Sequence, residues 1–172
     1  VSGNITGNVT WDLSNNPIWV ENDVFVKGNL TIDRGAELYF NGSFGMYVEG
    51  SLNITGTSSN PVLFTSNMTS PDKGDWYGIQ YNSSATVGDT IIDHVEVSYA
   101  KDGLNLLGSA PPVTHSYIHH NSQTGINATF VYAEIYNCTI VHNGEVKEHK
   151  GEGNISAGRG GGIWGTGTSN PD

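Results

Sequence analysis

Short runs of alternating apolar and polar residues recur along the chain at a spacing of about 22 residues. Residues 25–32 match residues 47–54 at an offset of 22, and the stretch that begins at His94 recurs at His115 and at Asn137. Each repeat holds about three such runs, which are shorter than a helix needs and lack the helical period. The pattern predicts three short strands in every repeat.

Three strands in one repeat describe a rung of a parallel β-helix, in which equivalent residues of successive rungs stack about 4.8 Å apart. We therefore predict an all-β fold, a single-stranded right-handed parallel β-helix with three sides and about 22 residues per rung. Asn121 and Asn143 share a turn position, where stacked asparagines can hydrogen-bond along the ladder. The predicted inward columns are Val97, Ile118, Ile140; Val95, Ser116, Cys138; and Leu104, Ile126, Ile163. The predicted outward columns are Glu96, Tyr117, Thr139; and His94, His115, Asn137.

The two ends of the chain depart from this repeat. Residues 1–20 break the 22-residue spacing, so we expect them to form a cap or a strand-donating segment ahead of a solenoid that spans residues 21–172. Residues 144–161 add a Gly-rich, charged insertion, which predicts a protruding loop. Ile163 begins a rung that the remaining residues do not complete. We expect either a longer protein or an open end that docks onto another subunit.

Composition excludes several classes of partner. The chain has a net charge of −10, which repels nucleic acid and anionic lipid. It has no apolar run long enough for a membrane-spanning helix, so no direct membrane span is expected. Cys138 is the only cysteine, which excludes a disulfide within the chain, and the alternation places it inward as an inert residue.

Asparagine provides the strongest functional signal, because ten of the 18 asparagines open an Asn-X-Ser/Thr sequon without proline in the middle. Eight of the middle residues are apolar, as expected for strands whose Asn and Thr face water while the middle residue faces a core. Covalent N-glycans are therefore the predicted modification, and the predicted location is extracellular or at the cell surface. The predicted acceptors are Asn4, Asn8, Asn29, Asn41, Asn53, Asn67, Asn82, Asn127, Asn137 and Asn154.

Residues 29–40, 50–66 and 74–79 resemble rungs of right-handed parallel β-helix repeat proteins with the pectin-lyase-like fold. The resemblance implies the fold but not an activity, because such proteins include lyases, hydrolases, surface proteins and adhesins. The sequons and the acidic charge further resemble archaeal cell-surface β-helix proteins. Polygalacturonase-like members carry Gly-His-Gly and Arg-X-Lys segments, and neither string occurs in this chain.

Candidate catalytic residues are few. Arg34 and Arg159 are the only arginines, and the repeat places neither beside an acidic cluster of the kind that pectate-lyase-like members use. Asp93 and Asp102 share a rung, but no feature of the sequence brings their carboxylates together as glycoside hydrolysis requires. We predict no catalytic residue and no enzymatic activity.

The histidines and tryptophans each allow two interpretations. His94 and His115 stack one rung apart, as do His120 and His142, but no third ligand is evident for either pair. We therefore predict stacking on a solenoid face, with no metal site and no cofactor. The four tryptophans can either stack on sugars or pack under turns. They are Trp11, Trp19, Trp76 and Trp164.

These features together predict a non-enzymatic, heavily N-glycosylated extracellular structural protein. It would serve as a surface-layer, sheath, filament or adhesin module, and it would self-associate head-to-tail through the open solenoid ends. The alternative is a carbohydrate-active or carbohydrate-binding β-helix domain that uses an aromatic groove.

Overall fold

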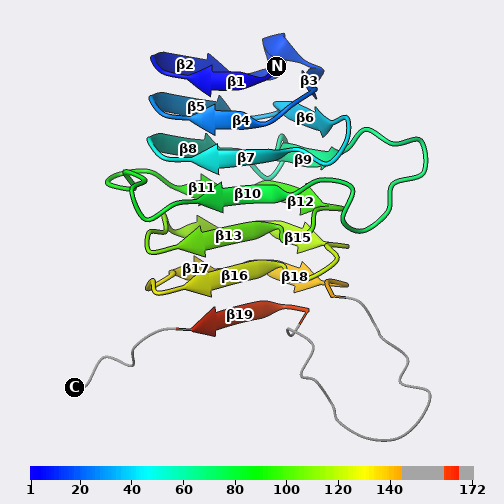
Figure 1. Cartoon of the computed structure of the whole chain (residues 1–172), viewed down its shortest axis with the longest axis vertical. Helices are drawn as coiled ribbons and strands as arrows, with labels where there is room; N and C mark the ends of the chain where they lie inside the picture. The colour runs from blue at the N-terminus through cyan, green and yellow to red at the C-terminus, as the bar shows by residue number, and fades with distance from the viewer. Residues whose placement is uncertain (145–160, 167–172) are drawn as a thin grey trace, which may run out of the picture.

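The computed structural model describes residues 1–144 and 161–166, which form a three-sided parallel β-helix of six turns and the first strand of a seventh (Figure 1). Sheet A contains β1 (Gly3–Ile5), β4 (Val24–Val26), β7 (Gly45–Val48), β10 (Gly78–Tyr81), β13 (Leu104–Leu107), β16 (Ile126–Thr129) and β19 (Ile163–Thr166). Sheet B contains β2 (Asn8–Trp11), β5 (Asn29–Asp33), β8 (Ser51–Thr55), β11 (Ile92–Asp93), β14 (Val113–Thr114) and β17 (Ile135–Tyr136). Sheet C contains β3 (Ile18–Val20), β6 (Glu37–Phe40), β9 (Val62–Ser66), β12 (Val95–Ser98), β15 (Tyr117–His119) and β18 (Thr139–Val141).

The register of the strands confirms the predicted repeat. Val97 pairs with Ile118 and Ile118 with Ile140, and in the next sheet Leu104 pairs with Ile126 and Ile126 with Ile163. One inward column runs through all six turns, because each strand places alternate residues inside and the turns keep the same phase. Its members are Ile18, Leu38, Phe64, Val97, Ile118 and Ile140.

The core fills the space between the three sheets. Phe40 and Trp76 stack inside it with ring centroids 3.8 Å apart, and Trp76 Nε1 donates to the carbonyl of Ser98 at 2.8 Å. Both rings are fully buried, so Trp76 packs under a turn and is not available to a sugar. Cys138 stacks below Ser116 as predicted but is only half-buried, and this burial raises the pKa of its thiol.

The corners of the solenoid require unusual backbone. The corner between sheets A and B brings successive turns so close that a Cβ on Gly50 would lie 2.3 Å from the carbonyl oxygen of Gly28. Only glycine fits there, which explains why Gly28 and Gly50 recur one repeat apart. The later corners on either side of sheet C instead contain residues other than glycine at positive φ. They are His94, Tyr99, His115, His120, Asn137 and His142, with φ between 48° and 61°.

The predicted asparagine ladder forms at one of these corners. Asn121 is fully buried, and its Oδ1 accepts from the backbone N–H of Ala100 at 2.8 Å. Its Nδ2 donates to Oδ1 of Asn143 at 2.8 Å, and Nδ2 of Asn143 donates to the carbonyl of Ile118 at 3.0 Å. The ladder thus satisfies buried backbone groups of three successive turns.

Residues 1–20 correct the predicted domain boundary. They form β1, β2 and β3, which pair in register with β4, β5 and β6, so the solenoid begins at β1 and not at residue 21. The single 3₁₀ helix of the described chain, η1 (Leu13–Asn15), explains the irregular spacing, since it inserts a turn between β2 and β3. Asp12 caps this helix and accepts from the N–H of Ser14 at 2.8 Å.

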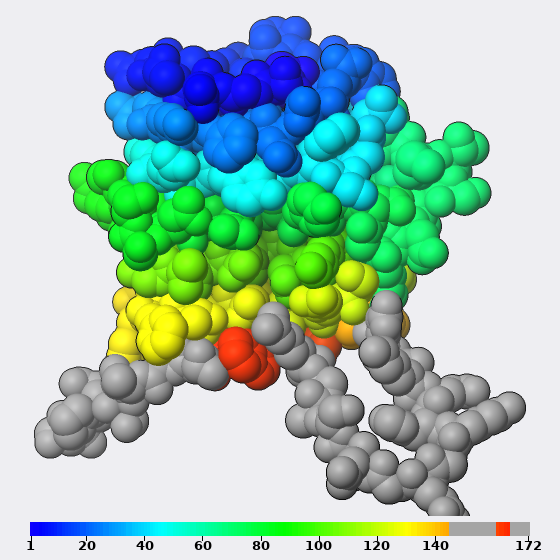
Figure 2. Space-filling view, viewed as in Figure 1, coloured from blue at the N-terminus to red at the C-terminus, as the bar shows by residue number. Residues whose placement is uncertain are grey.

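Two long connections leave the solenoid on opposite sides in Figure 1, at residues 67–77 and 82–91. In space-filling view the turns from blue to yellow pack directly on one another, and the first of these connections projects from their side (Figure 2). The loop predicted at 144–161 lies almost wholly outside the described residues. Within the described residues, no helix is long and apolar enough to cross a membrane.

Candidate functional site

The sequon asparagines are distributed around the solenoid. Asn4 lies on sheet A, Asn8 and Asn29 lie on sheet B, and Asn41 and Asn67 directly follow strands of sheet C. All five side chains are exposed, and so is that of Asn137 at the corner between sheets B and C. Asn53 and Asn82 are half-buried, and Asn154 lies outside the described residues.

Two pairs of sequons stack one turn apart. Asn29 pairs with Asn8 in register, and its Nδ2 donates to Asn8 Oδ1 at 2.8 Å. Asn41 and Asn67 occupy equivalent positions, because each donates its backbone N–H at 2.9 Å to the last residue of the sheet C strand one turn earlier. The repeat therefore places neighbouring acceptors about one strand spacing apart.

Asn127 departs from the prediction that its side chain stands free on a sheet face. It does lie on the outward side of β16, but only 6% of it is exposed. Asn105 and Trp164 flank it in register on the neighbouring strands, and Thr129 Oγ1 donates to its Oδ1 at 3.3 Å. A glycan needs an accessible acceptor nitrogen, so Asn127 is a poor acceptor in the folded protein.

The most concentrated chemistry lies at the corner between sheets B and C. Asp93 ends β11, His94 follows it in the turn, and His115 occupies the same turn position one rung later. Because His94 and His115 have nearly the same φ, 49° and 48°, their rings leave the backbone in parallel. They stack with centroids 4.8 Å apart and planes inclined by 17°.

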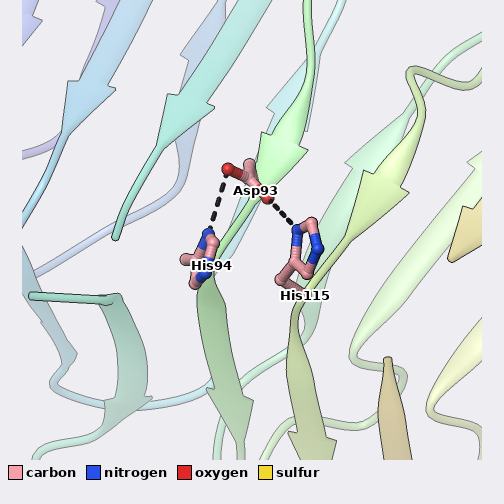
Figure 3. Close-up of side chains that lie close together, drawn as sticks. All are labelled: Asp93, His94 and His115. Carbon is pink, nitrogen blue, oxygen red and sulfur yellow. Dashed lines mark hydrogen bonds and ion pairs between the residues drawn. The ribbon is translucent and has the colours of Figure 1, made fainter. Parts of the chain in front are cut away.

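The carboxylate of Asp93 lies between the Nδ1 atoms of the two imidazoles (Figure 3). Oδ1 of Asp93 is 2.9 Å from Nδ1 of His115, and Oδ2 is 3.0 Å from Nδ1 of His94. Thr114 Oγ1 also donates to Oδ1 at 2.5 Å. The three potential ligand atoms all lie within 4.8 Å of one another.

The electrostatics of this corner keep the carboxylate ionised. Partial burial alone would raise the pKa of Asp93, but hydrogen bonds from Thr114 and His115 and the neighbouring His94 outweigh it and lower the pKa to about 2. The distance between His94 Nδ1 and Asp93 suits an ion pair, yet the angle does not allow a hydrogen bond. This nitrogen is thus buried without a hydrogen-bond partner among the described residues.

A second group of rings lies on and beside sheet C. His120 stacks on His142 with centroids 5.2 Å apart, as the sequence predicted, and Tyr99 stacks on His120 at 5.7 Å. His119 Nδ1 is 2.7 Å from His120 Nδ1, and His119 Nε2 is 3.2 Å from Glu96 Oε1. Burial and the neighbouring charges of His119, His142 and Lys73 lower the pKa of His120.

The structure separates the two aspartates that share a rung. Asp93 precedes β12 and Asp102 follows it, so a strand of sheet C lies between them. Asp102 is 8% exposed, and its Oδ1 accepts from both the backbone N–H and the hydroxyl of Thr124. Asp102 therefore holds the turn before β13 together and does not face Asp93.

Sequence reasoning missed Asp93 as a partner of the histidine pair. The signal was present, because Asp93 directly precedes His94, and Thr114 precedes His115 in the matching position. In an extended strand, neighbouring side chains point to opposite faces, which argues against a shared site. The positive φ at His94 breaks that alternation and brings both side chains to one corner.

A parallel β-helix with this register is the architecture of the pectate-lyase-like proteins. The family described as pectate-lyase like beta helix domain matches residues 3–105, which is more than half of the chain. The chain therefore belongs to this family, which confirms the resemblance noted in the sequence. The match begins in the first turn, in agreement with the corrected start of the solenoid. No curated protein and no solved structure matches the chain.

Proposed function

We propose that this chain is a non-enzymatic, N-glycosylated extracellular structural protein that serves as a module of a surface layer, sheath, filament or adhesin. One observation carries the proposal. Six sequon asparagines have exposed side chains, and they lie around the solenoid on its sheets and corners rather than in one loop. A solenoid decorated in this way is stiff along its axis and sterically shielded on its sides.

The stacked sequon pairs add to this proposal. Asn8 with Asn29, and Asn41 with Asn67, stand one turn apart. A glycan is much wider than the strand spacing of about 4.8 Å, so occupied neighbours must spread away from each other over the sheet surface. Such a cover leaves little bare surface for a long polysaccharide groove, which favours a structural role over an enzymatic one.

Mass spectrometry of the protein from its native source tests this proposal. We expect the intact mass to exceed the sequence mass and to fall on deglycosylation. Peptide mapping should find glycans on Asn8, Asn29, Asn41 and Asn67, with Asn127 as the internal control that stays unmodified. An unmodified intact mass, or occupancy at Asn127 equal to that at Asn29, would contradict the proposal.

Head-to-tail self-association is part of the proposed role. Within the described chain, β1, β2 and β3 are outer strands of their sheets, and an outer strand offers unpaired backbone groups. A pocket of about 340 Å³ lies at this first turn, lined in part by Trp11, Ile18 and Trp19. Sedimentation and negative-stain microscopy at high concentration should reveal oligomers that Trp19→Lys weakens and Tyr77→Lys, at a distant exposed ring, does not. Dispersed monomers at all concentrations would overturn this part.

A carbohydrate-binding or carbohydrate-active domain is the second candidate, and exposed ring pairs favour it. Phe25 and Tyr47 stack on sheet A with centroids 5.2 Å apart, and Trp19 and Tyr39 pair on sheet C at 5.3 Å. Aromatic faces of this kind can stack on sugar rings. A polysaccharide screen separates the candidates. Binding lost in Tyr47→Ala supports a binding domain, and turnover lost in Asp93→Asn would overturn the structural role.

A further inference from the structure

We propose that Asp93, His94 and His115 form a binding site for a first-row divalent transition metal such as Zn²⁺, which would tie the fourth turn of the solenoid to the fifth. The ligands are two imidazole nitrogens and one carboxylate oxygen, a donor set that suits zinc and its neighbours in the first row. This site goes beyond the proposed glycosylated structural role and does not depend on it.

The positions of the ligand atoms fit such an ion. In a tetrahedral zinc site with bonds of about 2.0–2.1 Å, ligand atoms lie roughly 3.3 Å apart. The two Nδ1 atoms are 2.9 and 3.0 Å from the carboxylate oxygens of Asp93, so each pair must open by only a few tenths of an ångström. The two nitrogens lie within 4.8 Å of each other, and tilting of the stacked rings closes this gap.

Two further features support an ion at this corner. Nδ1 of His94 is buried yet has no hydrogen-bond partner among the described residues, and a metal would satisfy its lone pair. Both histidines also occupy positive φ, where a side chain costs more than glycine and where asparagine is common. The equivalent position of the sixth turn is Asn137, which shows that this corner does not itself require imidazole.

Asn137 completes the surroundings. Its Nδ2 lies 3.3 Å from Nε2 of His115. When Nδ1 of a neutral imidazole binds a metal, the ring proton lies on Nε2, and the amide of Asn137 can turn its oxygen to accept it. Ligating histidines are commonly oriented by such a hydrogen bond. Three protein ligands leave the remaining coordination positions to water, consistent with side-chain exposures of 25% for His94 and 47% for His115.

The nature of the ligands also predicts selectivity. Ca²⁺ and Mg²⁺ are held by oxygen atoms and gain little from imidazole, so they should not occupy this corner. Zn²⁺, Co²⁺, Ni²⁺ and Cu²⁺ should, with Cu²⁺ the tightest of the series. The metal would link residues that are 21 or 22 positions apart in the sequence, which are adjacent only because the chain has completed a turn.

Titration of the untagged, metal-free 172-residue chain tests the site. Zn²⁺ at a hundredfold excess over its Kd should raise Tm by about 5–10 °C, and EDTA should reverse the rise. Co²⁺ should produce visible absorption, while Ca²⁺ should change neither signal. His115→Asn and Asp93→Asn should each weaken zinc affinity about tenfold or more.

The variants are matched to the fold. His115→Asn copies Asn137 of the next turn, and Asp93→Asn keeps an oxygen that can accept from Thr114. His120→Asn is the control, since it removes a stacked histidine with the same backbone conformation at the other corner. His94→Asn replaces His115→Asn should that variant fail to fold by circular dichroism. Absence of a zinc-dependent Tm shift, or equal zinc affinity in the wild type and His115→Asn, or equal loss in His120→Asn, would overturn the site.

Discussion

The first three turns of the solenoid and the next three share one core but carry different surfaces. Turns one to three, from β1 to β9, hold six of the sequon asparagines and no histidine. Turns four to six, from β10 to β18, hold five of the six histidines and the sequons at Asn82, Asn127 and Asn137. The glycan acceptors and the metal-binding chemistry are therefore assigned to different parts of one scaffold.

The corners differ in the same way. Gly3, Gly35 and Gly42 provide positive φ in the first three turns, whereas His94, Tyr99 and five other non-glycine residues do so from the fourth turn onward. The inward column passes through both parts without interruption. The comparison teaches that the core dictates where a corner lies, while the residue at that corner is free to serve chemistry at a modest conformational cost.

The largest expected effect comes from breaking the core that the two parts share. Phe64 is fully buried in the third turn and stacks between Leu38 and Val97. Phe64→Ala should lower the free energy of unfolding by about 3–5 kcal/mol, because it leaves a cavity in a packed interior. Urea denaturation should still show one transition. Leu63→Ala, at the outward neighbour, should cost about 1 kcal/mol or less. Two separate transitions would contradict a shared core.

A smaller loss is expected from the asparagine ladder of the later turns. Asn121→Ala removes the acceptor for Ala100 N–H and the donor to Asn143 in a fully buried position. Leaving such groups unpaired should cost about 2–3 kcal/mol in the free energy of unfolding, measured by urea denaturation. Asn105→Ala, on the outward side of β13, is the matched control. Equal effects of the two changes would show that the ladder contributes nothing particular.

The two kinds of corner can be compared directly by substitution. Gly35 has φ of 73°, and the nearest atom to an added Cβ is 3.4 Å away, so Gly35→Ala tests backbone conformation alone. It should cost about 1–2 kcal/mol. His120→Asn, at φ of 54°, should change the free energy of unfolding by no more than about 0.5 kcal/mol, because asparagine tolerates this region well. A large loss in His120→Asn would mean that the ring stack itself stabilises the later turns.

The smallest expected effect is a pH dependence confined to the later turns. Burial first, and then the charges of His119, His142 and Lys73, lower the pKa of His120 below its ordinary value, and Tyr99 stacks on the same ring. The unfolded chain therefore binds this proton more readily. Stability is present above about pH 6.5 and is lost as pH falls through the folded-state pKa. Thermal unfolding in EDTA from pH 7.5 to 5.5 should show a smaller slope for His120→Asn than for the wild type. Identical slopes would contradict this assignment.

Much of the fold was predictable from the sequence because the repeat is a local signal. A spacing of 22 residues and alternating runs define strands, phase and columns, and the register confirms Val97, Ile118 and Ile140 as one inward column. The first turn was missed because η1 and its cap at Asp12 lengthen one connection and hide the spacing. The stacking of His94 on His115 was predictable for the same reason as the columns.

What the sequence by itself determined is the solenoid, its register and the set of candidate acceptors, since all of these follow from periodicity. Only the tertiary structure decided which groups are accessible and which converge. Asn127 carries the same motif as Asn29, but its neighbours on β13 and β19 cover it. Asp93 joins the two histidines because a positive φ at His94 turns adjacent side chains to one corner. Burial and backbone sign depend on chain segments one full turn away, and a local pattern does not encode them.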